Sequence, residues 1–172
     1  MIGTASASKH ERLRAMGVAH VIDYRARNFE PEVRRITGGR GVDLALDAVG
    51  GRSFRKSYRC LAKLGRLFVF GLSSAAPGPA RRMTTALKQV ALLPRFNPLS
   101  LMKENRAVLG VNLGRLWDRT DLLRGMMKEI VERTAGGTFD PVVDRTFPFD
   151  RAADAHAYIH ERKNFGKVLL TP

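Results

Sequence analysis

The chain has 172 residues, a net charge of +14 at pH 7 and a single cysteine, Cys60. This length suits one domain, or one domain with a piece of another, and an apolar fraction of 44% is enough for a core. One cysteine excludes an internal disulfide and a cysteine metal cluster, which is typical of a reducing compartment such as the cytoplasm. No stretch has the pattern of a signal peptide or the roughly 18 consecutive apolar residues of a membrane span.

Strands and helices alternate along most of the chain, which favours an α/β fold built on a parallel sheet. The sequence predicts strands over 1–4, 19–24, 42–51, 65–74 and 107–114, with helices over 8–16, 29–36 and 54–64 between them. Ser8 and Glu11 have the spacing of a capping box, and Gly17 stands where a helix-ending glycine belongs. The run 42–51 is almost continuously apolar, which predicts a strand buried on both faces.

Residues 75–106 interrupt this alternation. They hold a Pro-Gly-Pro loop, an amphipathic stretch from Met83 to Leu93 and a short helix after Asn97, which together are too long for a simple connection. The stretch could form a lid, a partner-binding arm, a membrane-surface helix or a locally packed helix. Beyond it, the sequence predicts helices over 121–133 and 150–162, a short segment over 140–147 and a last strand over 167–170.

The basic residues do not form a nucleic-acid motif. They are scattered along the whole chain and most are arginines, which favours a solvated basic surface. We interpret local pairs such as Arg34–Arg35 and Arg81–Arg82 as parts of the same solvated surface. Nucleic acid is therefore not an expected partner.

The turn after the first strand, "IGTASASK" over residues 2–9, contains hydroxyls and a lysine but no acidic residue. In dinucleotide-binding folds, an acid at the end of the second strand binds the ribose 2′-OH of NAD, whereas basic residues there accommodate the 2′-phosphate of NADP. Ser6, Ser8 and Lys9, together with the N–H groups of a helix start, suit a phosphate. The alternative is that Ser8 only caps the helix and Lys9 is solvated.

Five segments in order carry a family resemblance: "GTASASKHERLRAMGVAHVIDYR", "VDLALDAVGG", "GRLFVFGLSS", "VLGVNLG" and "FPFDRAADAHAYIHERKNFGKVLL". Together they resemble the C-terminal half of a medium-chain dehydrogenase/reductase, in particular the quinone oxidoreductase branch with its zeta-crystallin-like and vesicle amine transport protein-like members. The resemblance covers nearly the whole chain. It implies that residues 1–137 form a Rossmann-like doubly wound parallel sheet that lacks its first strand. Residues 138–172 would then form a segment that returns to a catalytic domain outside this chain.

The resemblance also implies which positions contact NADPH. They are Ser6 and Lys9 at the 2′-phosphate, Tyr24 beside the adenosine, Gly50 and Ser53 at the adenine ribose, Phe70, Gly71 and Leu72 beside the nicotinamide, and Val111, Asn112 and Leu113 at its carboxamide. All of them lie at or near the carboxyl ends of predicted strands, where open α/β sheets bind ligands. The alternative at each position is structural: the apolar residues would be core and the glycines would be turn residues.

The family's glycine-rich pyrophosphate turn has no match, because "GGRGVD" (38–43) precedes a strand instead of following one. In the strand order 3-2-1-4-5-6, the missing first strand would lie in the middle of the sheet. Its absence would expose two apolar edges, so we expect a chain that is marginally stable alone or that pairs with another chain.

The leading prediction is the cofactor-binding portion of an NADPH-dependent oxidoreductase, which passes hydride from the nicotinamide to a quinone, an enone or a small carbonyl compound. Such chemistry needs no protein nucleophile, and we assign no catalytic residue and no metal ligand in this chain. His156 and His160 lie four apart on a predicted helix, but no third ligand is evident, so we interpret them as surface or packing residues.

Two alternatives to an enzyme remain open. One is a non-catalytic interaction protein that uses its basic surface, with weak association with a membrane. The other is an incomplete gene product without a function of its own. The resemblance also implies a possible homodimer, formed through the edge strand near Val111.

Overall fold

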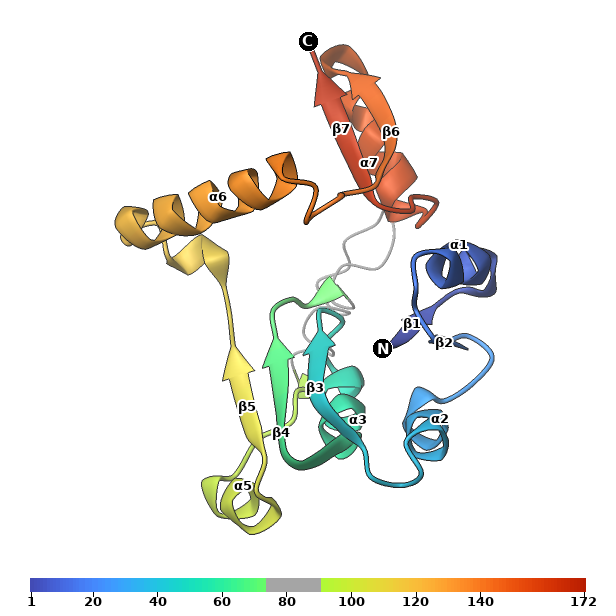
Figure 1. Ribbon diagram of the computed structural model, residues 1–172, viewed down its shortest axis with the longest axis vertical. Helices are drawn as coiled ribbons and strands as arrows, with labels where there is room; N and C mark the ends of the chain where they lie inside the picture. The colour runs from blue at the N-terminus through green and yellow to red at the C-terminus, as the bar shows by residue number, and fades with distance from the viewer. Residues whose placement is uncertain (74–90) are drawn as a thin grey trace. The chain divides into compact units, whose positions relative to one another are not determined.

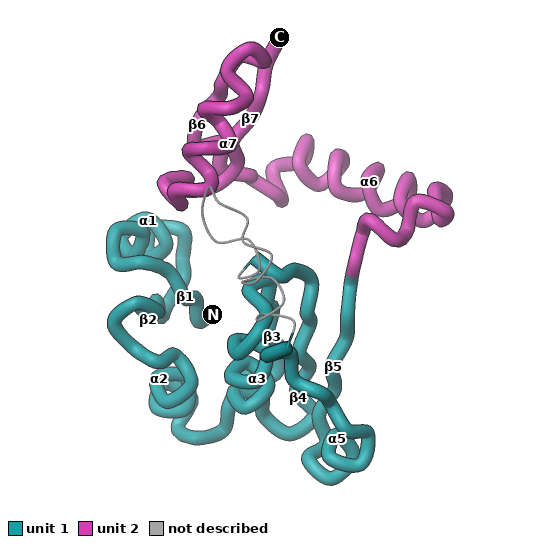
Figure 2. Tube along the Cα trace, turned by 180° about the vertical axis from the view of Figure 1, so that it is seen from behind, with its two compact units in different colours: residues 1–76, 82–111 teal, residues 77–81, 112–172 magenta. Residues whose placement is uncertain are grey.

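The structure, a computed structural model, describes residues 1–73 and 91–172 (Figure 1). The amphipathic stretch from Met83 to Leu93 therefore lies almost wholly outside the described residues. The described residues form two compact units, residues 1–73 with 91–111 and residues 112–172 (Figure 2). The domain boundary expected after residue 137 stays a prediction.

The first unit is an α/β unit in which every paired strand is parallel, which confirms the predicted fold class. Its strands are β1 (Ile2–Ala5), β2 (His20–Asp23), β3 (Val42–Asp47), β4 (Leu61–Val69) and β5 (Ala107–Gly110). Its helices are a 3-10 turn (Ala7–Lys9), α1 (His10–Ala15), α2 (Phe29–Ile36), α3 (Arg52–Arg59) and α5 (Pro98–Glu104). The strands form two sheets, β1-β2 and β3-β4-β5.

The first predicted helix begins differently from the expectation. A 3-10 turn over Ala7–Lys9 precedes α1, and the expected capping box of Ser8 and Glu11 is wrong, because no side chain caps either start. The Ser8 hydroxyl instead lies 3.3 Å from the Ser6 hydroxyl. Gly17 ends the helical segment with φ +84°, as expected.

The predicted helix over 54–64 is too long at its carboxyl end. Helix α3 ends at Arg59, and residues 61–64 belong to β4. Leu61 and Leu67 of β4 are fully buried, so burial in the sheet outweighs the helical periodicity of this stretch.

Strand β3 is buried on one face only, which corrects the expectation for 42–51. Ser57 of α3 covers the face that carries Asp47, whereas Leu44 and Leu46 are 53% and 67% exposed. The described helices of the first unit leave this second face open.

A small apolar cluster of Ile22, Val33 and Cys60 forms the core of the first unit. Ile2, Phe29, Ile36 and Val42 pack around it. The cluster thus draws on both sheets as well as on α2. Burial raises the pKa of the Cys60 thiol to about 11.

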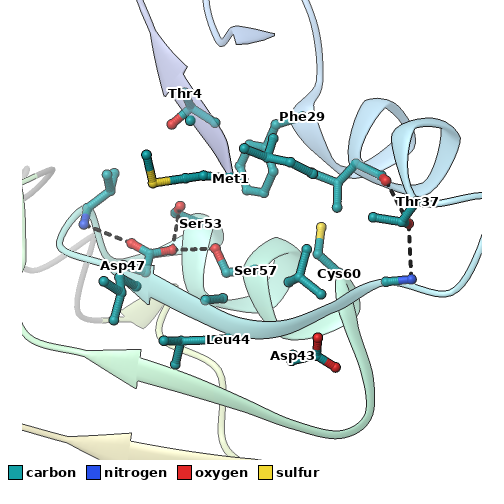
Figure 3. A pocket seen from close by; sticks show the side chains of 18 of the residues that line it. Met1, Thr4, Phe29, Thr37, Asp43, Leu44, Asp47, Ser53, Ser57 and Cys60 are labelled. Carbon is teal, nitrogen blue, oxygen red and sulfur yellow. Dashed lines mark hydrogen bonds between the residues drawn. The ribbon is translucent and has the colours of Figure 1, made fainter. Parts of the chain in front are cut away.

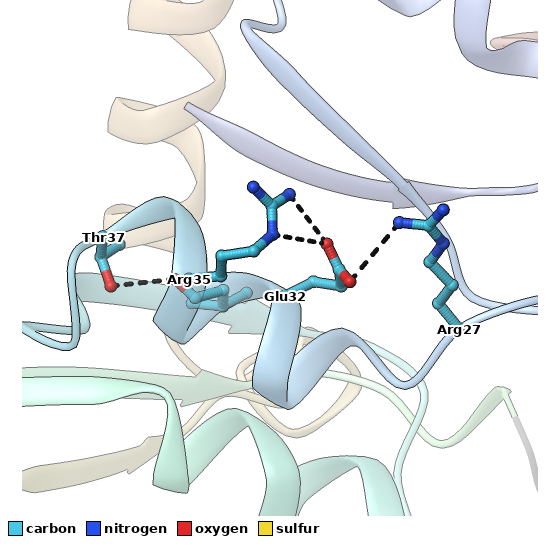
Figure 4. Close-up of polar contacts among 5 residues, drawn as sticks. Arg27, Glu32, Arg35 and Thr37 are labelled. Atoms are coloured by element: carbon cyan, nitrogen blue, oxygen red, sulfur yellow. Dashed lines mark hydrogen bonds and ion pairs between the residues drawn. The ribbon is translucent and has the colours of Figure 1, made fainter.

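Helix α2 matches its predicted bounds and is fixed at both ends. The Asn28 side chain accepts from the Glu30 N–H (3.4 Å), and the Thr37 hydroxyl donates to the Val33 carbonyl (2.9 Å). Glu32 lies 2.9 Å from Arg35 and 3.5 Å from Arg27 (Figure 4). The hydrogen bond from Arg35 holds the pKa of Glu32 below its usual value.

The second unit contains a long helix and a two-stranded parallel sheet. Its elements are a 3-10 turn (Leu113–Arg115), α6 (Thr120–Ala135), β6 (Val143–Pro148), a 3-10 turn (Phe149–Arg151), α7 (Ala152–His160) and β7 (Lys167–Thr171). Strand β6 pairs with β7, and the Tyr158 hydroxyl donates to Asp144 at 2.9 Å, which ties α7 to β6. These elements confirm the helices and the strand predicted after residue 120.

Gly41 provides a test of the packing between β3 and β4. It has φ +87°, and a Cβ there would lie 2.6 Å from the Cys60 carbonyl oxygen. Gly39 has a similar φ of +85° but open space around it. We expect Gly39→Ala to lower the free energy of unfolding by about 1 kcal/mol through backbone strain, and Gly41→Ala by about 3 kcal/mol through strain and overlap together. Urea unfolding followed by circular dichroism measures both, and equal losses would contradict the close approach.

The raised pKa of Cys60 predicts a pH-dependent contribution to stability. Because the unfolded thiol ionises first, the stability that the buried neutral thiol contributes is fully present below about pH 8.5. It is lost as the pH rises toward the folded pKa of about 11. We expect the difference in unfolding free energy between wild type and Cys60→Ala, measured in urea with a reductant, to shrink from pH 7.5 to pH 10. A difference that stays constant with pH would show that the thiol is not desolvated.

Candidate functional site

The carboxyl ends of the paired strands are in register within each sheet of the first unit. Ala5 pairs with Asp23 at the ends of β1 and β2, so the chain leaves both strands at the same level. Asp47 pairs with Val69, and Val69 pairs with Gly110, at the ends of β3, β4 and β5. In open α/β sheets this edge is where ligands bind.

The turn after β1 brings together two hydroxyls and a lysine. The Ser6 and Ser8 oxygens lie 3.3 Å apart, and the Lys9 N–H donates to the Ser6 carbonyl at 3.0 Å, which closes the turn. The first acidic side chain after β1 is Glu11, inside α1. The turn therefore offers hydroxyl donors and a cation to an anion, and no carboxylate stands directly after the strand.

Tyr24 follows β2 at the level of Ser6 and is 41% exposed. The neighbouring Asp23 carboxylate accepts from the Arg25 N–H at 2.9 Å, so it stabilises its own turn. Ser6, Lys9 and Tyr24 thus all follow the carboxyl ends of β1 and β2, and their assignment to a phosphate stays a prediction.

Asp47, which the sequence analysis missed, organises the turn after β3 (Figure 3). Its carboxylate is 4% exposed and accepts from the hydroxyls of Ser57 (2.6 Å) and Ser53 (2.8 Å). It also accepts from the N–H groups of Val49 (2.8 Å) and Gly50 (3.4 Å). An acid inside an apolar run, followed by small residues and two serines, was the available signal.

This network defines what Ser53 and Gly50 can do. The Ser53 hydroxyl donates inward to Asp47, so it presents only acceptor capacity to a ligand. Gly50 is buried with φ +85°, which supports the turn-glycine interpretation at that position.

The turns after β3 and β4 are joined through the backbone. The Phe70 N–H donates to the Asp47 carbonyl (3.2 Å), and the Ser73 N–H donates to the Ala48 carbonyl (2.9 Å). A Cβ on Gly71 would lie 2.9 Å from the Ala48 oxygen, so only glycine allows this approach. The joined turns form one continuous rim.

The apolar side chains of this rim are exposed. Phe70, Leu72 and Val111 are 52%, 42% and 40% exposed, so the core alternative is wrong for them. Asn112 and Leu113 continue the chain in the second unit, where the Asn112 side chain accepts from the Gly114 N–H at 3.1 Å. Leu113 is 59% exposed and is not core either.

A cavity of about 710 Å³ lies between the two sheets of the first unit (Figure 3). Residues 1–4 of β1 and residues 42–49 around β3 line its sides, and Phe29, Val33 and Cys60 line it from the helices. Asp47 and Ser53 are among its lining residues, whereas Ser6, Ser8 and Lys9 of the predicted phosphate turn are not.

The described residues hold no cluster of three or more histidine, cysteine or acidic side chains that could bind a metal ion. The rings of His156 and His160 are 6.5 Å apart on α7. Within residues 1–73 and 91–172, no helix has the length and apolar character needed to cross a membrane.

Comparison with known sequences identifies the relatives of this chain. A family profile described as zinc-binding dehydrogenase matches residues 16–170. The human synaptic vesicle membrane protein VAT-1 homolog is 36% identical over 172 residues, which cover 100% of this chain and 44% of that protein. A 2-haloacrylate reductase from a Burkholderia species is 30% identical over 177 positions, covering 100% of this chain and 48% of the enzyme.

Solved structures agree with these relatives. The crystal structure of the human VAT-1 homolog-like protein aligns with a TM-score of 0.72 and 28% identity over 99% of this chain and 46% of its own. The chain spans about half the length of the relatives it matches. It belongs to the zinc-binding dehydrogenase family of medium-chain dehydrogenase/reductases and corresponds to the C-terminal half of a member.

Proposed function

We propose that this chain is the cofactor-binding portion of an NADPH-dependent oxidoreductase that reduces a quinone, an enone or another small carbonyl compound. One observation carries the proposal: the strand ends are aligned, and the turn after β1 offers Ser6, Ser8 and Lys9 where an NAD-binding site would offer a carboxylate. The name of the related 2-haloacrylate reductase supports reduction as the class of reaction.

The turn after β1 would hold the phosphate end of the cofactor. The Ser6 hydroxyl would donate a hydrogen bond to the 2′-phosphate, and the Lys9 ammonium would attract it electrostatically. Tyr24 would lie beside the adenosine. Arg25 is exposed directly after Tyr24 and adds positive charge at the same edge. The turn held by Asp47 would border the ribose through Gly50 and Ser53.

Phe70, Gly71 and Leu72 of the rim would lie at the nicotinamide, together with Val111, whose N–H donates to the Val69 carbonyl. Asn112 and Leu113 are next along the chain. The reduced nicotinamide supplies the hydride when it is bound. These residues would therefore orient the nicotinamide ring and exclude water, and would not react themselves. Their exposed apolar side chains suit that role, because burying them against a ligand removes apolar surface from water. Pairing of two copies near Val111, through the edge of β5 that no described strand occupies, is part of this proposal.

This proposal assigns no zinc ligand within the described residues. The family is named for zinc, but the described residues offer no set of three metal ligands. No step of the reaction is therefore assigned to a metal bound by them.

Lys9 provides the direct test. Charge-assisted bonds to a phosphate contribute about 1.5 to 3 kcal/mol, so we expect Lys9→Ala to weaken NADPH binding about tenfold or more and to leave NADH binding nearly unchanged. Calorimetric titration of the 172-residue chain with each nucleotide measures both, and Lys63→Ala, which removes an exposed lysine from the amino half of β4, is the control. A preference for NADH, equal losses for both nucleotides, or a folded chain that binds neither would refute the proposal.

A membrane-surface role has one feature in its favour. Leu64, Leu99 and Met102 are each more than 70% exposed, and Leu64 and Met102 line one open hollow together with Arg66. Apolar side chains beside basic ones are typical of a surface that meets anionic lipid. The name of the related vesicle membrane protein agrees with such a role.

Liposome sedimentation distinguishes this role from the enzymatic one. If it is correct, the chain binds vesicles containing phosphatidylserine, binding falls steeply with added salt, and Leu64→Ser with Met102→Ser abolishes it. The control is Leu46→Ser, which changes an exposed leucine on β3. If vesicle binding changes neither with added salt nor with the Leu64 and Met102 substitutions, the membrane-surface role is excluded.

A further inference from the structure

The carboxylate of Asp47 fixes the direction of the hydrogen bonds that it makes in the turn after β3 (Figure 3). Its Oδ1 atom accepts from the N–H groups of Val49 (2.8 Å) and Gly50 (3.4 Å). Its Oδ2 atom accepts from the hydroxyls of Ser57 (2.6 Å) and Ser53 (2.8 Å). A carboxylate has no hydrogen to donate, so all four groups must direct their hydrogens toward Asp47.

Ser53 is the member of this network that can meet a ligand through its side chain. Asp47 and Ser57 are 4% and 9% exposed, whereas Ser53 is half-buried. The single hydroxyl hydrogen of Ser53 is bonded to Asp47, and none of the described residues donates to its oxygen. A serine oxygen can accept two hydrogen bonds, and a donor chain that ends on a charge polarises it further. Ser53 therefore offers a strong acceptor and no donor.

The turn after β1 has the opposite polarity. The hydroxyls of Ser6 and Ser8 lie 3.3 Å apart and either of them can donate, and Lys9 adds a positive charge. An anion is attracted there, whereas at Ser53 it would meet lone pairs with a buried negative charge behind them. Thr4 of β1 and Ser53 line the same cavity (Figure 3). The two turns thus present different chemistry to ligands of this edge.

We propose that Asp47 is a specificity-determining residue that acts through Ser53, so that the turn after β3 accepts a hydrogen bond from a ligand hydroxyl and rejects a phosphate. This inference rests on the proposed function, in which the 2′-phosphate of the adenine ribose meets the turn after β1. The free hydroxyl of that ribose is then the 3′-hydroxyl, and the Ser53 oxygen accepts its hydrogen. Asp47 is a positioning residue, because it holds the Ser53 hydrogen away from the ligand.

Three nucleotides distinguish an accepting Ser53 from a donating one. They are adenosine 2′,5′-bisphosphate, its 3′-deoxy analogue and its 3′-deoxy-3′-fluoro analogue, each titrated calorimetrically into the 172-residue chain. The deoxy compound lacks the hydroxyl, and the fluoro compound keeps a weak acceptor without a hydrogen. We expect both to bind about tenfold more weakly than the parent compound, because each leaves the Ser53 oxygen without its donor. A fluoro compound that binds as tightly as the parent would overturn the proposal.

Asp47→Asn tests the role of the carboxylate. The two N–H groups at Oδ1 require an acceptor, so the amide oxygen takes that place and the amide NH2 group faces Ser53 and Ser57. The Ser53 oxygen then accepts from the amide, and its hydrogen is free to turn toward the ligand. We expect the preference for the parent over the fluoro compound to fall from about tenfold to about twofold or less. A preference that stays tenfold in Asp47→Asn would refute the role of Asp47.

Ser57→Ala is the matched control, because it removes a donor from the same carboxylate and leaves the Ser53 hydrogen on Asp47. We expect a lower urea midpoint with an unchanged preference among the three nucleotides. If Ser57→Ala reduces the preference as Asp47→Asn does, the network supports only the fold and the proposal is wrong. Should Asp47→Asn fail to fold, Ser53→Ala gives the answer: it should bind all three nucleotides alike, and a retained preference would overturn the proposal.

The same titrations separate this inference from the proposed NADPH site. All three nucleotides carry the 2′-phosphate, so Lys9→Ala should weaken them by the same factor and leave the preference for the 3′-hydroxyl intact. Equal binding of the parent and deoxy compounds by the wild type would overturn the role of Ser53 and leave the phosphate site standing. A folded chain that binds none of the three would refute both.

Discussion

The first unit depends on the side-chain cluster of Ile22, Val33 and Cys60, because no described strand pairs across the space between β1 and β3. In a continuous sheet, backbone hydrogen bonds would share the task of holding these strands. Here the cluster joins β2, α2 and the end of α3, and its members are at most 6% exposed. The position of β1 relative to β3 therefore follows from a few apolar contacts, and a change at Cys60 or at the adjoining Gly41 acts on both sheets.

The site is built mainly by backbone geometry at the carboxyl ends of the strands. Register places the turns at the same level, and Asp47 then fixes the turn after β3 through two hydroxyls and two N–H groups. A buried carboxylate with donors on both oxygens is stabilising, whereas the same group without them would be costly. Asp47 acts within the protein, and the residues that it holds, Gly50 and Ser53, are those that the proposed function assigns to the ribose.

Local signals predicted some elements well and failed where the sheet decided the outcome. Helix α2 is followed by Gly38–Gly39, and its observed bounds are those that the sequence predicts. The end of α3 could not be read in this way, because Leu61 has helical spacing but is buried in β4. The apolar pattern of β3 is typical of a strand covered on both faces, yet Leu44 and Leu46 are exposed, because the described helices cover only the other face.

The candidate site divides in the same way. Ser6, Lys9 and Tyr24 could be grouped from the sequence, because they follow strands that were predicted to be neighbours. Asp47 could not be found by searching for exposed polar residues, since its role appears only when α3 brings Ser57 against it. The exposure of Phe70 also depends on tertiary structure, because β4 ends just before it and its side chain is not covered.

The residues assigned to the cofactor belong to both sheets of the first unit. Under the proposed function, those at the phosphate follow β1 and β2, whereas those at the ribose and the nicotinamide follow the strands of the other sheet. A dinucleotide that contacted all of them would favour one relative position of the two sheets. A protein whose binding-competent arrangement is less populated binds its ligand more weakly. Under the proposed function, a substitution in the apolar cluster of Ile22, Val33 and Cys60 should therefore weaken dinucleotide binding without touching the ligand.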